Sequence, residues 1–143
     1  MSQLERNLYT AKAHTTGGRD GGVSRTSDHR LEVKLTNPGA KGDGTNPEQL
    51  FAMGWSSCFL SAIKLAEAAK KLRLSPDTAV DAEVDLNTKD GKYYLAARLY
   101  VTLPDMEARS AQDLIDEAHR LRPYSRAVHG NIEVETKLAE TVA

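Results

Sequence analysis

Apolar side chains occupy every second position in residues 31–35, 80–86 and 95–103, with polar or small residues between them. A period of two is typical of a β-strand that buries one face. The turn-forming residues 87–91 join the second and third of these segments, so the pattern predicts a β-hairpin there. Further strands are predicted at residues 8–16 and 132–138. Residues 19–30 have turn-forming residues at both ends of a short apolar stretch and are interpreted as turns.

A long helix is predicted from Pro47 to about Lys71. Asn46 is a favourable N-cap, Pro47 suits the first helical position, and Gln49 can complete a capping box. A second helix is predicted from about Ser110 to Leu121, where Pro123 interrupts the pattern. Helices and strands are grouped rather than strictly alternating, which predicts an α+β fold with a largely antiparallel sheet.

Apolar side chains cover most of the circumference of the helix that begins at Pro47, and charged residues return only near its end. A helix of this kind is enclosed on most sides. In so small a protein, a second copy of the chain would provide that enclosure most simply. We therefore expect an obligate homodimer with this helix at its centre.

Composition limits the possible size and partners of the protein. The chain has 143 residues, of which 40% are hydrophobic, enough for one core, so we expect a single domain over residues 1–143. The formal net charge is −1, from 19 Lys and Arg against 20 Asp and Glu, and we do not expect nucleic acid as a partner. The segment MSQLERN lacks the apolar core of a signal peptide, and no apolar run approaches the roughly 18 residues of a membrane span. No membrane partner is expected.

Cys58 is the only cysteine, so it has no second thiol in the chain with which to form a disulfide. This fits a reducing cytoplasm. A free cysteine usually behaves as a small buried hydrophobe, and a thiol becomes reactive only beside a cation or a helix N-terminus. Cys58 lies about three turns into its predicted helix, so any activation must come from elsewhere. The candidate cations are Arg19, in a glycine-rich turn, and Arg122, next to Pro123.

Two other kinds of site could use this thiol, a Cys-His hydrolase and a metal centre. A Cys-His hydrolase would require a histidine beside Cys58, whereas the histidines are scattered over predicted strands, loops and helix ends. No pair of histidines or of histidine and cysteine has a spacing typical of metal ligands, so no metal is expected. The histidines are His14, His29, His119 and His129.

Five short segments follow one another in a distinctive order along the chain. They are LYTAKA (8–13), GGRDG (17–21), TNPEQLFAMGWSSCFLSAIK (45–64), PYS (123–125) and GNIEV (130–134). Together they closely resemble the organic hydroperoxide resistance proteins of the OsmC/Ohr family. The resemblance runs from about Leu8 to Leu138.

The resemblance implies an α+β subunit intertwined with its twin in a homodimer, with antiparallel sheets packed around central helices and two active sites at the interface. It also implies a cytoplasmic thiol peroxidase that reduces alkyl or fatty-acid hydroperoxides to alcohols. No bound cofactor is implied, because a lipoylated protein or another external dithiol would recharge the thiol.

Carried over to this sequence, the peroxidatic thiol is Cys58, and its partners are Arg19 and Glu48. Only a thiolate attacks a peroxide effectively, a guanidinium can stabilise both the thiolate and the developing oxyanion, and a carboxylate can hold that guanidinium. Glu48 and Cys58 lie about 15 Å apart along one helix, which favours contributions from two chains or a bend at Gly54. The residues that could form an apolar wall for the substrate, or simply pack in the core, are Phe51, Met53, Trp55 and Phe59.

The sequence departs from the family at Arg122. Family members usually have a second cysteine immediately before the Pro-Tyr-Ser segment, which resolves the oxidised thiol into an internal disulfide. Without it, Cys58 must be reduced directly by an external thiol or remain oxidised. An alternative function therefore stays open: a redox sensor that does not turn over, or a binder of apolar ligands with the same fold.

Overall fold

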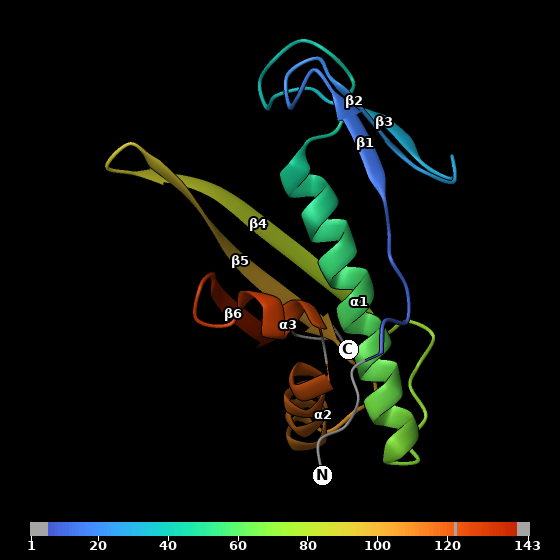
Figure 1. The fold of residues 1–143 in the computed structure, drawn as a ribbon. Helices are drawn as coiled ribbons and strands as arrows, with labels where there is room; N and C mark the ends of the chain where they lie inside the picture. Colours follow the sequence, from blue (N-terminus) through green and yellow to red (C-terminus); the bar gives the residue numbers. More distant parts are fainter. Residues whose placement is uncertain (1–5, 122, 140–143) are drawn as a thin grey trace. The chain divides into compact units, whose positions relative to one another are not determined.

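The computed structural model describes residues 6–121 and 123–139 (Figure 1). The chain divides into two compact units, Met1–Pro47 and Glu48–Ala143. The expectation of a single domain stays a prediction.

The first unit contains a three-stranded antiparallel sheet in the order β1-β2-β3, made of β1 (Ala13–Thr16), β2 (Val23–Thr26) and β3 (Glu32–Lys34). The tight turn between β1 and β2 requires glycine. A Cβ on Gly22 would lie 2.1 Å from the carbonyl oxygen of Gly18, and Gly17 and Gly18 have positive φ angles. β1 is shorter than predicted, and β2 replaces part of the segment that was interpreted as turns.

The second unit begins with the long helix α1 (Pro47–Ala69). Pro47 is its first residue, as predicted, and Lys71 follows its end with a φ of 57°. A buried stripe along this helix packs against β-strand and helix residues in the core of the unit. The stripe consists of Trp55, Phe59, Ala62, Ile63 and Ala66.

A long hairpin forms the larger part of the second sheet. Strands β4 (Ala79–Lys89) and β5 (Lys92–Thr102) are antiparallel, and Lys89 pairs with Lys92 across the two-residue turn. The turn residues Asp90 and Gly91 have φ angles of 53° and 76°, as a hairpin turn with two left-handed residues requires. The predicted hairpin is confirmed, with a shorter turn than expected.

The α+β fold is confirmed, and three of the four pairings between the described strands are antiparallel; the edge of this sheet is the exception. Strand β6 (Glu133–Leu138) pairs with β5 in the parallel sense. Between them the chain crosses over through α2 (Ala108–Leu121) and the short α3 (Pro123–Val128). This crossover returns the chain to the end of the sheet where β5 began, so β6 runs in the same direction as β5 (Figure 1).

The two faces of the second sheet differ in polarity. Ala97, Leu99 and Val101 of β5 face the core, where they pack with the buried stripe of α1 and the apolar face of α2. On the other face Arg98 donates hydrogen bonds to both oxygens of Asp85 at 2.8 and 2.7 Å, and this interaction lowers the pKa of the Asp85 carboxyl. None of the helices in residues 6–121 and 123–139 combines the length and the apolar composition of a membrane span.

Candidate functional site

Cys58 lies in the middle of α1 and is half-buried. Trp55 and Phe59, on either side of it in the sequence, are fully buried. Since successive residues of a helix point about 100° apart, the thiol lies at the border between the buried stripe and the accessible side of the helix. The sulfur therefore belongs neither to the interior nor to a fully exposed surface.

The serines around Cys58 hydrogen-bond to helix carbonyls one turn earlier. Ser57 Oγ donates to the carbonyl oxygen of Met53 at 2.6 Å, and Ser61 Oγ donates to that of Ser57 at 3.1 Å. Ser56 Oγ donates to the carbonyl oxygen of Ala52 at 2.8 Å. These hydroxyl protons are therefore engaged with the helix backbone and are not directed at the Cys58 sulfur.

Tyr124 of α3 packs on the α1 face one turn before Cys58. Its ring centroid is 6.2 Å from that of Phe51, and its hydroxyl oxygen would lie 3.2 Å from a Cβ added at Gly54. Gly54 and Cys58 are four positions apart, so they share a face of the helix. Sequence reasoning used the Pro-Tyr-Ser segment only for its resemblance and missed this contact. Gly54 was the signal that the sequence offered, because a glycine inside an otherwise strong helix marks a position where another part of the chain packs closely on the helix.

Replacing Gly54 with alanine should raise the free energy of unfolding, because alanine is favoured over glycine inside a helix by about 1 kcal/mol. Part of this gain should be lost in moving the Tyr124 hydroxyl away from the new methyl group. We expect the gain to be larger when Gly54→Ala is made in a Tyr124→Phe background. Urea denaturation of the four proteins measures this difference, and equal gains in both backgrounds would contradict the contact.

The predicted partners of Cys58 belong to different elements of the chain. Glu48 is in the first turn of α1 and is half-buried, ten positions before Cys58 on a helix that continues unbroken through Gly54. Arg19 is half-buried in the turn between β1 and β2 of the first unit. Arg122 lies outside the described residues.

The four predicted substrate-contacting side chains do not share one environment. Trp55 and Phe59 are fully buried in the core of the second unit, whereas Met53 is 63% exposed. Phe51 is half-buried, between the edge of the Trp55 ring, 5.4 Å away, and the Tyr124 ring. Within the second unit, Phe51 and Met53 are the members of this set that a ligand can reach directly.

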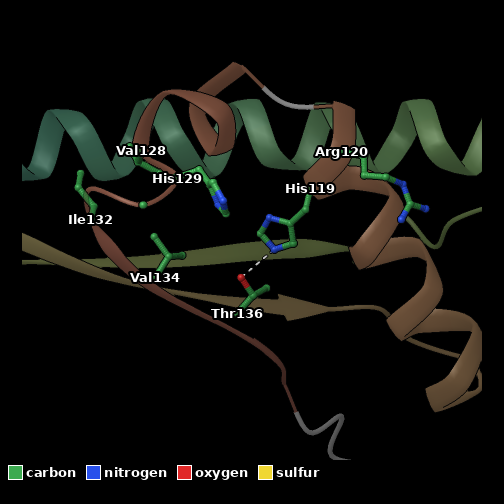
Figure 2. Close-up of a pocket in the computed structure, with 8 residues that line it drawn as sticks. His119, Arg120, Val128, His129, Ile132, Val134 and Thr136 are labelled. Carbon is green, nitrogen blue, oxygen red and sulfur yellow. Dashed lines mark hydrogen bonds between the residues drawn. The ribbon is translucent and has the colours of Figure 1, made fainter.

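The ring of His119 packs on the buried stripe of α1. Its ring centroid is 4.9 Å from that of Phe59, and its Nε2 forms a hydrogen bond of 2.9 Å with Thr136 Oγ1. This bond directs Nε2 toward Thr136 on β6 (Figure 2). It therefore gives no support to a Cys-His hydrolase, which would need a histidine beside Cys58. In residues 6–121 and 123–139, no three His, Cys, Asp or Glu side chains form a candidate metal site.

The chain is similar to proteins of one family over most of its length. A family model described as OsmC-like protein matches residues 39–137. An organic hydroperoxide resistance protein of Xanthomonas axonopodis pv. citri is 43% identical over 143 residues, covering 97% of this chain and 100% of that protein. The crystal structure of OhrB, an organic hydroperoxide resistance protein of Bacillus subtilis, has a TM-score of 0.87 at 33% identity and covers 93% of this chain and 100% of its own. The crystal structure of an organic hydroperoxide resistance protein from Elizabethkingia anophelis, with thiocyanate bound, has a TM-score of 0.87 at 37% identity. It covers 96% of this chain and 100% of its own chain.

Proposed function

Because the chain belongs to the OsmC-like protein family, we propose that it acts in defence against organic hydroperoxides as a cysteine-based peroxidase that reduces them to alcohols. The observation that carries the proposal is the position of the only cysteine, half-buried on α1, in a chain 43% identical over its length to an organic hydroperoxide resistance protein. A thiol at such a border can reach both an apolar substrate and solvent.

The proposed reaction begins with attack of the Cys58 thiolate on one oxygen of the peroxide. The O–O bond breaks, the other oxygen leaves as an alkoxide that takes up a proton, and Cys58 becomes a sulfenic acid. One thiol of an external dithiol then displaces water and forms a mixed disulfide with Cys58. Attack by its second thiol releases the Cys58 thiolate and leaves the reductant oxidised.

Arg19 and Glu48 are the proposed supports of this step. The Arg19 guanidinium would stabilise the thiolate and the negative charge that develops on the peroxide oxygen, and Glu48 would orient it. Glu48 and Cys58 are separated by about 15 Å along a helix that is unbroken at Gly54. This separation favours an arrangement in which two chains contribute to each site.

A homodimer would also cover apolar side chains of α1 that a single chain leaves in solvent. Met53 is 63% exposed and Leu65 61% exposed, although both lie on a helix with few charges. We expect sedimentation at micromolar concentration to give a dimer. Leu65→Lys should weaken it, whereas Lys64→Glu, at the neighbouring exposed position, should not. A monomeric wild-type protein would contradict this arrangement.

Arg122 favours a second candidate function, a sensor that is oxidised once and signals in that state. The position usually held by the resolving cysteine is an arginine in this sequence, so no internal disulfide can end the oxidised state. Mixing the protein with cumene hydroperoxide in a stopped-flow instrument separates the candidates. A peroxidase turns over repeatedly when a dithiol is supplied, a sensor consumes one equivalent, and a binder of apolar ligands consumes none.

A further inference from the structure

A basic segment, residues 64–73, spans the end of α1 and has no part in the proposed reaction. It contains four cations and one carboxylate, a net charge of +3, whereas the whole chain has a formal net charge of −1. In residues 6–121 and 123–139, no salt bridge involves any of these cations, so their charges are open to a partner outside the chain. The four cations, all exposed, are Lys64, Lys70, Lys71 and Arg73.

The backbone at this end of the helix forms a defined turn. The Leu72 amide donates to the carbonyl oxygen of Glu67 at 3.0 Å, and the Lys71 amide donates to that of Ala68 at 3.2 Å. These two bonds are the pattern of a Schellman motif, in which the position of Lys71 is usually held by glycine. Lys71 has a φ of 57°, a left-handed conformation that is unfavourable for a residue with a Cβ. Since glycine would remove this cost, the lysine points to a use for its charge.

An exposed leucine lies among the cations of the basic segment. Leu72 is 39% exposed and separates Lys71 from Arg73. Residues 70–73 are all exposed, and the chain turns back here before it enters β4 (Figure 1), so the segment presents a convex surface. Lipid headgroups can rearrange around such a surface, whereas a protein partner would need a matching cleft. Apolar side chains among cations are typical of segments that lie on anionic lipid.

We propose that the basic segment docks on the surface of an anionic lipid bilayer. Its lysine and arginine side chains would contact the lipid phosphates, and Leu72 would enter the boundary between the headgroups and the acyl chains. The expectation that the chain has no membrane partner rested on the absence of a spanning segment, and binding at the surface needs none. This docking surface goes beyond the proposed reduction of peroxides and does not depend on it.

Cosedimentation of the full-length protein with sucrose-loaded vesicles tests the proposal. Vesicles of equal parts phosphatidylglycerol and phosphatidylcholine should bind the protein, and vesicles of phosphatidylcholine alone should not. Binding to the anionic vesicles should weaken at least about tenfold between roughly 50 and 500 mM sodium chloride, because salt screens charges at a surface. Absence of binding to the anionic vesicles, or equal binding to both compositions, would overturn the proposal.

Matched triple variants locate the contact. Lys70→Gln, Lys71→Gln and Arg73→Gln together should weaken binding about a hundredfold, because each cation near an anionic surface contributes about fivefold. Both triple variants change the net charge of the chain equally, so the same loss of binding in the control would contradict the location. The control removes three exposed cations elsewhere in the second unit, through Lys89→Gln, Lys92→Gln and Arg109→Gln.

Lys71→Gly separates binding from folding. Glycine removes the cost of the left-handed backbone, so this variant should unfold at a higher urea concentration than the wild-type protein. It should nevertheless bind the anionic vesicles about fivefold more weakly, a loss that a damaged fold cannot explain. Unchanged binding by Lys71→Gly would contradict a lipid contact at this position.

Leu72→Ala distinguishes a lipid surface from an acidic protein as the partner. Removing three carbon atoms should weaken binding to the anionic vesicles by up to about fiftyfold, whereas a purely electrostatic contact would not change. Polyglutamate, the probe for an acidic protein surface, should not displace the protein from the vesicles. Full binding by Leu72→Ala, or displacement by polyglutamate at an equal concentration of charge, would assign the basic segment to an acidic protein and overturn the lipid assignment.

Discussion

Cys58→Ser should lower the rate of organic hydroperoxide consumption by at least about a thousandfold, because a serine hydroxyl is not ionised near neutral pH and cannot replace the thiolate as nucleophile. Ser57→Ala is the matched control. Its hydroxyl already donates to the Met53 carbonyl oxygen, so removing it should leave the rate nearly unchanged. The rate of peroxide loss in the presence of a dithiol measures both variants.

Arg19 belongs to the same prediction, because the proposed mechanism makes the thiolate and its cation act as one unit. Arg19→Ala should slow consumption by about a hundredfold or more, the usual cost of removing one donor to a developing oxyanion. Arg30→Ala removes an exposed arginine of the same unit and should have little effect. Consumption by Cys58→Ser at the wild-type rate would eliminate the proposed chemistry, and a fully active Arg19→Ala would eliminate Arg19 from it.

The second large effect concerns oxidation without a reductant. One equivalent of alkyl hydroperoxide should convert Cys58 to a sulfenic acid that dimedone traps, and excess peroxide should convert it to sulfinic or sulfonic acid with nearly complete loss of activity. The reason is that the chain has no second cysteine to form an internal disulfide. Intact-mass analysis follows the added oxygen atoms.

Arg122→Cys is the informative variant for this effect. If position 122 comes near Cys58, with β-carbons about 3.8 Å apart, oxidation by the peroxide should yield an intramolecular disulfide, with the mass of two hydrogen atoms lost, and excess peroxide should no longer inactivate the protein. Arg120→Cys, on the exposed end of α2, controls for the mere presence of a second thiol. Resistance of the wild-type protein to overoxidation without added thiol would refute this account, as would Arg122→Cys without the disulfide.

The parts of the fold that could be predicted are those that bury one face. The start of α1 followed from Asn46 and Pro47, and the β4–β5 hairpin from apolar residues at every second position. Strand β2 was missed because the sheet of the first unit is largely exposed, and Val23 is followed by Ser24, Arg25 and Thr26 without a clear period. The direction of β6 could not be read from its own pattern, because it depends on where the α2–α3 crossover returns the chain.

The candidate site was predictable to a similar degree. The proposed peroxidatic thiol and its proposed partners came from short segments typical of a family, and the composition of α1 alone left Cys58 open to a purely structural role. The contact of Tyr124 with Gly54 joins residues seventy positions apart in the sequence, and no local pattern predicts such a pair. Likewise, the hydrogen bond between His119 and Thr136 depends on the crossover that makes β6 parallel.

The parallel pairing of β5 and β6 also has a consequence for the order of folding. The β4–β5 hairpin closes through a two-residue turn, and hairpins form within about 1–10 μs. Strand β6 can dock only after residues 103–132 have been synthesised and arranged as the crossover, which makes its pairing a late event. Until then the backbone of β5 from Ala96 to Val101 is an open strand edge, able to pair with another chain. A growing chain is therefore most prone to aggregation between the synthesis of β5 and the docking of β6.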